Sequence, residues 1–260
     1  MEDFIFDGKT LSSFGYVLCA FNGLDIETTP ISNMEYTTIK APLSDVSAKV
    51  SSDYPENLTT TIQICKSPCE YEYDDIITAH DISELSKWLC RKNYKWFSWV
   101  DKSDFAEVCY EAQIKMNKIT LYGKCIGLEL VINTNRPYAV TPLINTKVSG
   151  NNFKITAFSD EDGYIYPDVK IVVKGSGDLI LTNNYDNSST EIKNCVEGET
   201  IYIYGDILQI ETDSDREIYK DFNYVFPRLI SSYEKYINEF VSNIECDINI
   251  SYRGIRKVGI

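Results

Sequence analysis

The spacing of apolar and polar positions along the chain predicts mostly short β-strands. Residues 59–66 (TTTIQICK) and 106–116 (AEVCYEAQIKM) alternate the two kinds of side chain, and residues 125–133 (CIGLELVIN) are rich in β-branched side chains. At the start of the chain, Phe4 and Phe6 occupy alternate positions before the turn sequence DGK. Such segments are typical of half-buried antiparallel sheets, so we expect a mainly β protein.

One segment, residues 79–99 (AHDISELSKWLCRKNYKWFSW), has the spacing of a helix instead. Its apolar positions at steps of three and four are Ile82, Leu85, Trp88 and Leu89. We expect Asp81 or Ser83 to cap the helix, and the residues that complement its C-terminal end are Lys87, Arg91 and Lys92. The segment predicts a short amphipathic helix on a sheet, with Trp88 and Leu89 in the core. The aromatic residues that follow are predicted to belong to a strand that enters the same core, and they are Tyr94, Trp96, Phe97 and Trp99.

The change of domain is predicted within NTNRPYAVTPLINTK, because Pro137 and Pro142 interrupt both kinds of periodicity. A chain of 260 residues exceeds the usual size of one domain, so we expect two domains, 1–140 and 141–260. The second half again predicts strands separated by Gly, Asn and Asp turns, at the spacing of a β-sandwich, in residues 169–183, 195–213 and 246–254.

Residues 231–245 (SSYEKYINEFVSNIE) are open to two interpretations. The positions with helical spacing are Tyr233, Tyr236, Ile237 and Phe240. The segment lies among predicted sandwich strands, however, and this setting favours a loop followed by a strand.

Composition and charge exclude several classes of protein. With 43% apolar and 25% charged residues, the chain can bury ordinary cores. Its net charge is −14, with −7 in residues 1–140 and −7 in residues 141–260, so neither half offers the basic face that binds nucleic acid. The chain has no apolar run that could span a membrane, and its acidic N-terminus lacks the layout of a signal peptide. We expect a soluble protein made in the cytosol that neither grips nucleic acid nor enters a membrane.

The eight cysteines are scattered along the chain, which favours reduced thiols over a disulfide scaffold. Cys65 and Cys69 form the one close pair, in CKSPC. A zinc site would need two further ligands, and His80 is the only histidine. We expect His80 to be a surface or capping residue, and the role of the cysteine pair stays open.

Three further motifs carry possible chemistry. The carboxylates of EYEYDD (70–75) could serve glycoside hydrolysis only if two of them faced each other across a cleft. SDEDGYIYPD (159–168) resembles part of a calcium loop but lacks the EF-hand pattern, and a polar hairpin turn explains it equally well. KGSGD (174–178) lacks both phosphate-binding signatures and is predicted to be a β-turn. We therefore assign no catalytic, cofactor-binding or metal-binding residue and expect no enzyme and no cofactor.

Four segments, in order along nearly the whole chain, carry a family resemblance. They are DFIFDGKTLSSFGYVL (3–18), LSKWLCRKNYKWF (85–97), NTNRPYAVTPL (133–143) and FPRLISSYEKYINEFVSNIECDINISYRG (226–254). Together they resemble the distal tail protein (Dit) family of tailed bacteriophages, components of siphophage tails. The resemblance implies an N-terminal β-sandwich-like domain with one helix, and a C-terminal galectin-like β-sandwich.

The same resemblance implies a structural role in the virion tail, which is assembled in the host cytoplasm. The N-terminal domains would form a homohexameric ring that joins the end of the tail tube to a tail-associated lysin or other tail-tip or baseplate proteins. The ring would leave a channel for DNA. Two other functions stay open, namely a carbohydrate-binding module for recognition of the host surface and a cell-wall hydrolase.

Overall fold

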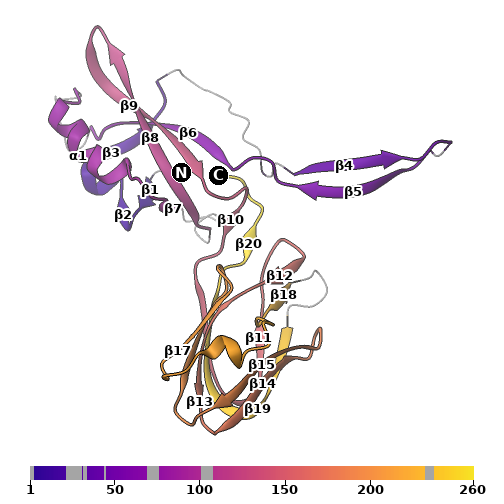
Figure 1. Ribbon diagram of the computed structural model, residues 1–260. Coiled ribbons are helices and arrows are strands. Elements are labelled where there is room, and N and C mark those ends of the chain that lie inside the picture. The colour runs from indigo at the N-terminus through magenta and orange to yellow at the C-terminus, as the bar shows by residue number, and fades with distance from the viewer. Residues whose placement is uncertain are drawn as a thin grey trace. The chain divides into compact units, whose positions relative to one another are not determined.

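The structure is a computed structural model, which describes residues 3–21, 31, 34–43, 45–68, 76–100, 108–231 and 237–260 (Figure 1). The chain divides into two compact units. The first unit comprises Met1–Val140 and Lys257–Ile260, and the second comprises Thr141–Arg256. The second unit thus ends before residue 260, where the expected domain ended. The last four residues return to the first unit because Val258 and Ile260 pack against its core.

Most strands of the first unit form one antiparallel sheet. The described strands of this unit are β1 (Asp3–Phe6), β2 (Lys9–Thr10), β3 (Tyr16–Cys19), β4 (Glu35–Lys40), β5 (Ser47–Asp53), β6 (Thr59–Lys66), β7 (Lys95–Val100), β8 (Tyr110–Leu121), β9 (Lys124–Thr134) and β10 (Ala139–Val140). The sheet has seven strands in the order β2-β1-β7-β8-β9-β6-β3. The strand predicted at 59–66 coincides with β6, the one at 125–133 lies within β9, and residues 110–116 of the third prediction lie in β8.

The predicted helix is α1 (Ala79–Leu89), but neither Asp81 nor Ser83 is its N-cap. The N-cap is Thr78, whose Oγ1 accepts a hydrogen bond from the Asp81 N–H at 3.2 Å. Asp81 returns the contact by accepting from the Thr78 N–H at 2.9 Å, which completes a capping box. Asp81 also pairs with the buried Lys66 of β6 at 3.1 Å, so the cap fastens the helix to the sheet.

The buried face of α1 carries the aromatic core of the first unit. Trp88 and Leu89 are buried as predicted, and the Trp88 indole N–H donates to the Phe6 carbonyl at 2.7 Å. The indole also stacks on the Phe14 ring, with a centroid distance of 4.3 Å. The hydrogen bond to Phe6 joins α1 to the strand β1. It also gives the buried indole N–H the partner that it needs in the core.

The expectation that all four aromatic residues after the helix enter the core is wrong for two of them. Phe97 and Trp99 are buried, whereas Tyr94 and Trp96 are exposed. Trp96 and Phe97 are neighbours in β7, and successive side chains of a strand point to opposite faces of its sheet.

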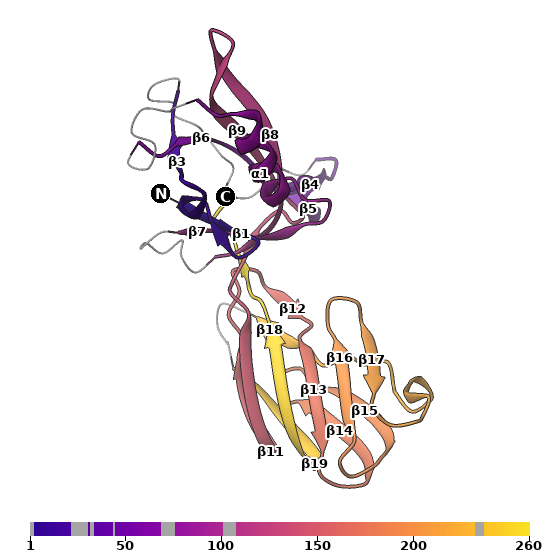
Figure 2. The same cartoon turned by 90° about the vertical axis from the view of Figure 1, so that its left-hand side faces the viewer.

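The second unit is a β-sandwich. Its strands are β11 (Ile144–Thr156), β12 (Gly163–Ile165), β13 (Asp168–Val173), β14 (Gly177–Asn183), β15 (Ser188–Cys195), β16 (Thr200–Tyr204), β17 (Gln209–Thr212), β18 (Leu229–Ser231), β19 (Ile237–Tyr252) and β20 (Ile255–Arg256). β19 pairs with β11 along its length, with β13 through residues 246–251, and with β14 through residues 240–242 (Figure 2). The long strands β11 and β19 therefore contribute to both layers. The register of the β11–β19 pair shifts after Gly150, whose φ is +105°. Such a bulge lets β11 bend as it passes from one layer to the other.

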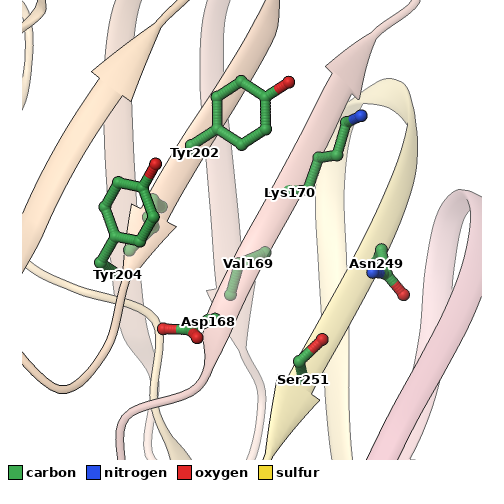
Figure 3. Close-up of a pocket in the computed structure, with 8 residues that line it drawn as sticks. Asp168, Val169, Lys170, Tyr202, Tyr204, Asn249 and Ser251 are labelled. Atoms are coloured by element: carbon green, nitrogen blue, oxygen red, sulfur yellow. The ribbon is translucent and has the colours of Figure 1, made fainter.

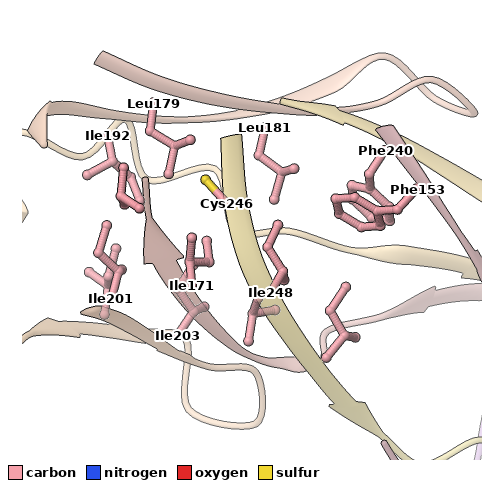
Figure 4. Close-up of a cluster of buried hydrophobic side chains, with 14 of the residues drawn as sticks. Phe153, Ile171, Leu179, Leu181, Ile192, Ile201, Ile203, Phe240, Cys246 and Ile248 are labelled. Atoms are coloured by element: carbon pink, nitrogen blue, oxygen red, sulfur yellow. The ribbon is translucent and has the colours of Figure 1, made fainter. Parts of the chain in front are cut away.

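Aliphatic side chains from both layers fill the sandwich, and the rings of Phe153 and Phe240 stack at one end with a centroid distance of 5.4 Å (Figure 4). Residues 237–245 lie in β19, so the strand interpretation of this segment is confirmed and the helical one is wrong. Tyr233 and Tyr236 lie outside the described residues. The buried positions of this stretch are Asn238, Phe240 and Ser242, which alternate as in a strand. Because two of these three side chains are polar, the alternation of apolar and polar residues that would predict a strand is missing from the sequence.

Taken with the first unit, the sandwich makes the chain mainly β with two domains, as predicted. In the described residues α1 is the only α-helix, and none of the described helices is long and apolar enough to cross a membrane.

A buried ionic cluster lies between β15, β16 and the segment after β17. The Glu199 carboxylate accepts from Thr212 Oγ1 at 2.6 Å and from Arg216 Nε at 2.9 Å. Burial opposes ionisation, but these hydrogen bonds hold the pKa of Glu199 below its usual value. Arg216 also pairs with Asp221 at 2.8 Å, so the cluster fixes the loop that follows β17.

Candidate assembly surface

The hairpin of β4 and β5 has no buried face. Among the described strands these two pair only with each other, and every described residue from 35 to 53 is exposed. Figure 1 shows this ribbon separate from the seven-stranded sheet of the same unit. We call residues 35–53 the arm.

The arm presents apolar side chains and unpaired backbone to solvent. Its large apolar residues, each more than half exposed, are Tyr36, Ile39, Leu43, Val46 and Val50. A two-stranded hairpin without a core is marginally stable in water at best, and its outer edges leave N–H and C=O groups that another chain can pair with. These are the properties of a surface that is completed by another polypeptide.

The base of the arm is attached to the first unit. Tyr54 directly follows β5, and its ring meets the Tyr138 ring edge-on with a centroid distance of 5.9 Å. The ammonium group of Lys257 lies 6.0 Å from the centroid of the Tyr54 ring. The arm is therefore anchored at one end by residues from three distant parts of the sequence.

The edges of the seven-stranded sheet are less suited to long contacts. The two edge strands are β2 with two residues and β3 with four, whereas β4 and β5 have six and seven. Short edge strands are a common protection against unwanted pairing. The arm thus offers the longer unpaired edges.

The structure describes one of the two cysteines of CKSPC, and it describes His80. Cys65 lies half-buried on β6, and Cys69 lies outside the described residues. Burial and a hydrogen bond with Cys65 raise the pKa of Cys19 to about 12, so Cys19 is protonated at neutral pH. His80 is exposed in the first turn of α1, which confirms it as a surface residue. None of the seven described cysteines forms a disulfide.

The acidic and glycine-containing motifs form no site in the described part of the chain. Residues 70–75 lie outside it, and the rest contains no group of three or more potential metal ligands. Asp160 pairs with Arg256 at 3.3 Å. The segment after it is not a hairpin turn, because β12 pairs with the distant β18. Residues 174–176 connect β13 to β14, two strands that do not pair with each other.

Comparison with known proteins decides the family. A family model described as a phage tail protein N-terminal domain matches residues 1–136, and one described as a phage tail C-terminal domain matches residues 138–252. The chain belongs to a phage tail protein family. The boundary between the two matches, after residue 136, lies close to the boundary of the compact units.

A solved structure supports the same assignment at the level of the fold. The Dit protein (gp 19.1) of phage SPP1 is similar with a TM-score of 0.67 and 11% sequence identity, over 97% of this chain and 99% of that one. That protein is described as a paradigm of the hub adsorption apparatus in phages that infect Gram-positive bacteria. No curated protein sequence matches. The resemblance to Dit proteins found in the sequence is therefore confirmed, and this phage tail protein has their two-domain fold.

Proposed function

We propose that this phage tail protein is a structural hub whose first unit assembles into a hexameric ring. The ring joins the end of the tail tube to tail-tip or baseplate proteins, including a tail-associated lysin, and leaves a central channel for DNA. The observation that carries this proposal is the arm, a long hairpin without a core in a unit that is otherwise well packed.

A closed ring would cover the arm of every copy. If each arm lies against the next copy in the same head-to-tail manner and the rotation between copies closes, a ring results in place of an open filament. The likeness to the SPP1 hub protein over nearly the whole of both chains supports this arrangement, and the resemblance to the Dit family supplies the number of six.

The charge of the chain suits a channel that DNA traverses without being held. With a net charge of −14, six copies repel the DNA backbone overall. The proposal therefore includes passage of DNA and no binding of it. It also assigns the protein no catalytic activity, since a hub requires only folded domains and self-association.

The test is the mass of the full chain in solution at several salt concentrations. Light scattering coupled to size exclusion is expected to show a six-copy species, favoured by moderate salt because screening weakens repulsion between acidic subunits. Negative-stain electron microscopy of that species is expected to show a ring with a central hole.

A matched pair of variants assigns the contact to the arm. Ile39→Asp places a charge on the arm and is expected to shift the protein toward monomers. Ile207→Asp places the same charge at an equally exposed position of the second unit, 60% against 59%, and is expected to leave assembly unchanged. A wild-type protein that stays monomeric at every salt and protein concentration, or rings that tolerate Ile39→Asp, would contradict the proposal.

A further inference from the structure

The second unit has a shallow hollow on the outward face of its sheet. The hollow has a volume of about 100 Å³, and the outward-facing residues that line it are Asp168, Lys170, Tyr202, Tyr204, Asn249 and Ser251 (Figure 3). Two rings from β16 stand on one side, two polar residues from β19 on the other, and a carboxylate and an ammonium group from β13 lie between them.

Strand alternation brings these side chains to one face. In β16, Ile201 and Ile203 are buried in the sandwich core, so Tyr202 and Tyr204 point outward. The same alternation in β13 and β19 directs their polar residues outward, because Val169, Ile171, Ile248 and Ile250 are the buried ones.

The register aligns the outward residues in rows across the three strands. Lys170 lies opposite Tyr202 on one side and opposite Asn249 on the other. Asp168 lies opposite Ser251 in the next row of the same face. The sheet thus presents aromatic and polar groups in two adjacent rows.

Several polar groups of the hollow have hydrogen-bonding capacity to spare. The Asn249 side-chain oxygen is buried and has no hydrogen-bond partner among the described residues. Lys170 holds its ammonium group 5.4 Å from the centroid of the Tyr202 ring. Asp168 uses one carboxylate oxygen to accept from the Gly205 N–H at 2.8 Å, which leaves the other for a ligand. Asp168 and Lys170 are exposed and can meet a ligand directly, whereas the buried Asn249 oxygen, a costly acceptor without a partner, can do so only when its side chain turns toward the hollow.

We propose that this hollow binds a neutral sugar ring of a surface glycan. A sugar ring has an apolar C–H face that packs against an aromatic ring, and hydroxyl groups that both donate and accept hydrogen bonds. The two tyrosine rings supply the apolar surface, and the Asp168, Asn249 and Lys170 side chains supply acceptors and donors around it. The carboxylates of Asp168 and of Glu211, which accepts from the Tyr204 hydroxyl at 3.2 Å, outnumber the one ammonium group of Lys170, which favours a neutral sugar over an acidic or phosphorylated one.

The proposed site goes beyond the role of a hub, because a ring that joins tail components needs no ligand on its second unit. It gives the second unit a function in contact with a cell surface. Sugar binding can be tested independently of ring assembly, since all residues of the site belong to one sandwich.

The test is binding of the full chain to a panel of neutral saccharides. The panel comprises methyl glycosides of hexoses and N-acetylhexosamines and their short oligomers. Binding of each saccharide is measured by saturation-transfer NMR. Because the hollow is shallow and open, we expect affinities on the order of millimolar for single rings. Binding is expected to persist in Ile39→Asp, whatever that variant does to assembly.

Variants within the hollow test the role of each side. Tyr202→Ala and Asn249→Ala are each expected to weaken binding by about tenfold or more. Both variants should still show a cooperative melt of the second unit, since neither residue belongs to the sandwich core and the Asn249 oxygen makes no hydrogen bond within the described chain. The matched control is Tyr224→Ala, which removes an exposed ring of the same unit outside the hollow and is expected to leave binding unchanged.

Three results would overturn the proposal. One is a wild-type chain that binds no member of the panel at millimolar concentration. Another is equal binding by the wild type and both hollow variants, which would place the sugar elsewhere. The third is selective binding of acidic saccharides only, which would contradict the neutral character assigned to the ligand.

Discussion

The β8–β9 hairpin and the arm are both antiparallel ribbons of the first unit, yet only one of them has a buried face. In β8 every second residue from Tyr110 to Ile114 is buried, and in β9 the same holds from Leu128 to Ile132. In the arm, no described residue is buried. The two ribbons therefore differ in where their stability comes from.

The difference shows that apolar side chains of similar type are buried in one ribbon of this unit and left exposed in the other. Burial of one face against α1 and the neighbouring strands makes β8–β9 stable within one molecule. The arm has side chains of similar type, but none of its described residues is buried. Under the proposed ring, a second copy supplies the surface that the rest of the chain supplies to β8–β9.

The largest effect is expected from opening the core that supports β8–β9. Trp88→Ala removes the ring that stacks on Phe14 and should destabilise the first unit by about 3 to 5 kcal/mol. A thermal melt should show the transition of this unit falling sharply. An unchanged melt would mean that the buried face of the unit does not depend on α1.

A slightly smaller effect is expected within the ribbon itself. Leu130 is fully buried in β9, so Leu130→Ala should cost about 2 to 5 kcal/mol in the unfolding free energy, measured by urea denaturation. A loss below 1 kcal/mol would show that the buried face of β8–β9 contributes little and would remove the contrast with the arm.

The pH dependence of the first unit is expected to follow Asp81. Burial opposes ionisation, but the hydrogen bond from the Thr78 N–H and the pairing with Lys66 hold the pKa of Asp81 below its usual value of about 4. A carboxylate with a lowered pKa in the folded state stabilises the fold above about pH 4, and this contribution is lost as the pH falls through the folded pKa. Asp81→Asn should cost about 1 to 2 kcal/mol at pH 7 and flatten the acid limb of the stability curve. An acid limb of unchanged slope in this variant would assign the dependence to other carboxylates.

The smallest effect on folding is expected in the arm. Ile39→Ala removes an apolar side chain that is 59% exposed, so the unfolding free energy of the monomer should change by less than about 0.5 kcal/mol. The same variant should weaken ring assembly, measured by light scattering on dilution. A large loss of monomer stability would show that the arm is already supported within its own chain.

Sequence patterns found the elements whose buried faces are apolar. TTTIQICK predicted β6 to the residue, and the positions Ile82, Leu85, Trp88 and Leu89 located the inner face of α1. The cap was missed because Asp81 is itself a common capping residue, and only the backbone shows that it occupies the third helical position. The sequence does not predict the arm, because its strands have no consistent apolar face, and this same property leaves them exposed.

What the sequence determined by itself is the local part of this protein: the strand and helix periods, the junction before residue 141 and the family resemblance. The tertiary structure alone decided which polar side chains are buried and which distant residues meet. Asn238 is buried in β19 because its side chain is held by Asn183 and by the backbone of Ile230, residues that lie elsewhere in the chain. The hollow likewise joins Lys170, Tyr202 and Asn249 across three strands, and the register between strands is set by the packing of the whole sandwich and is not written in any one of them.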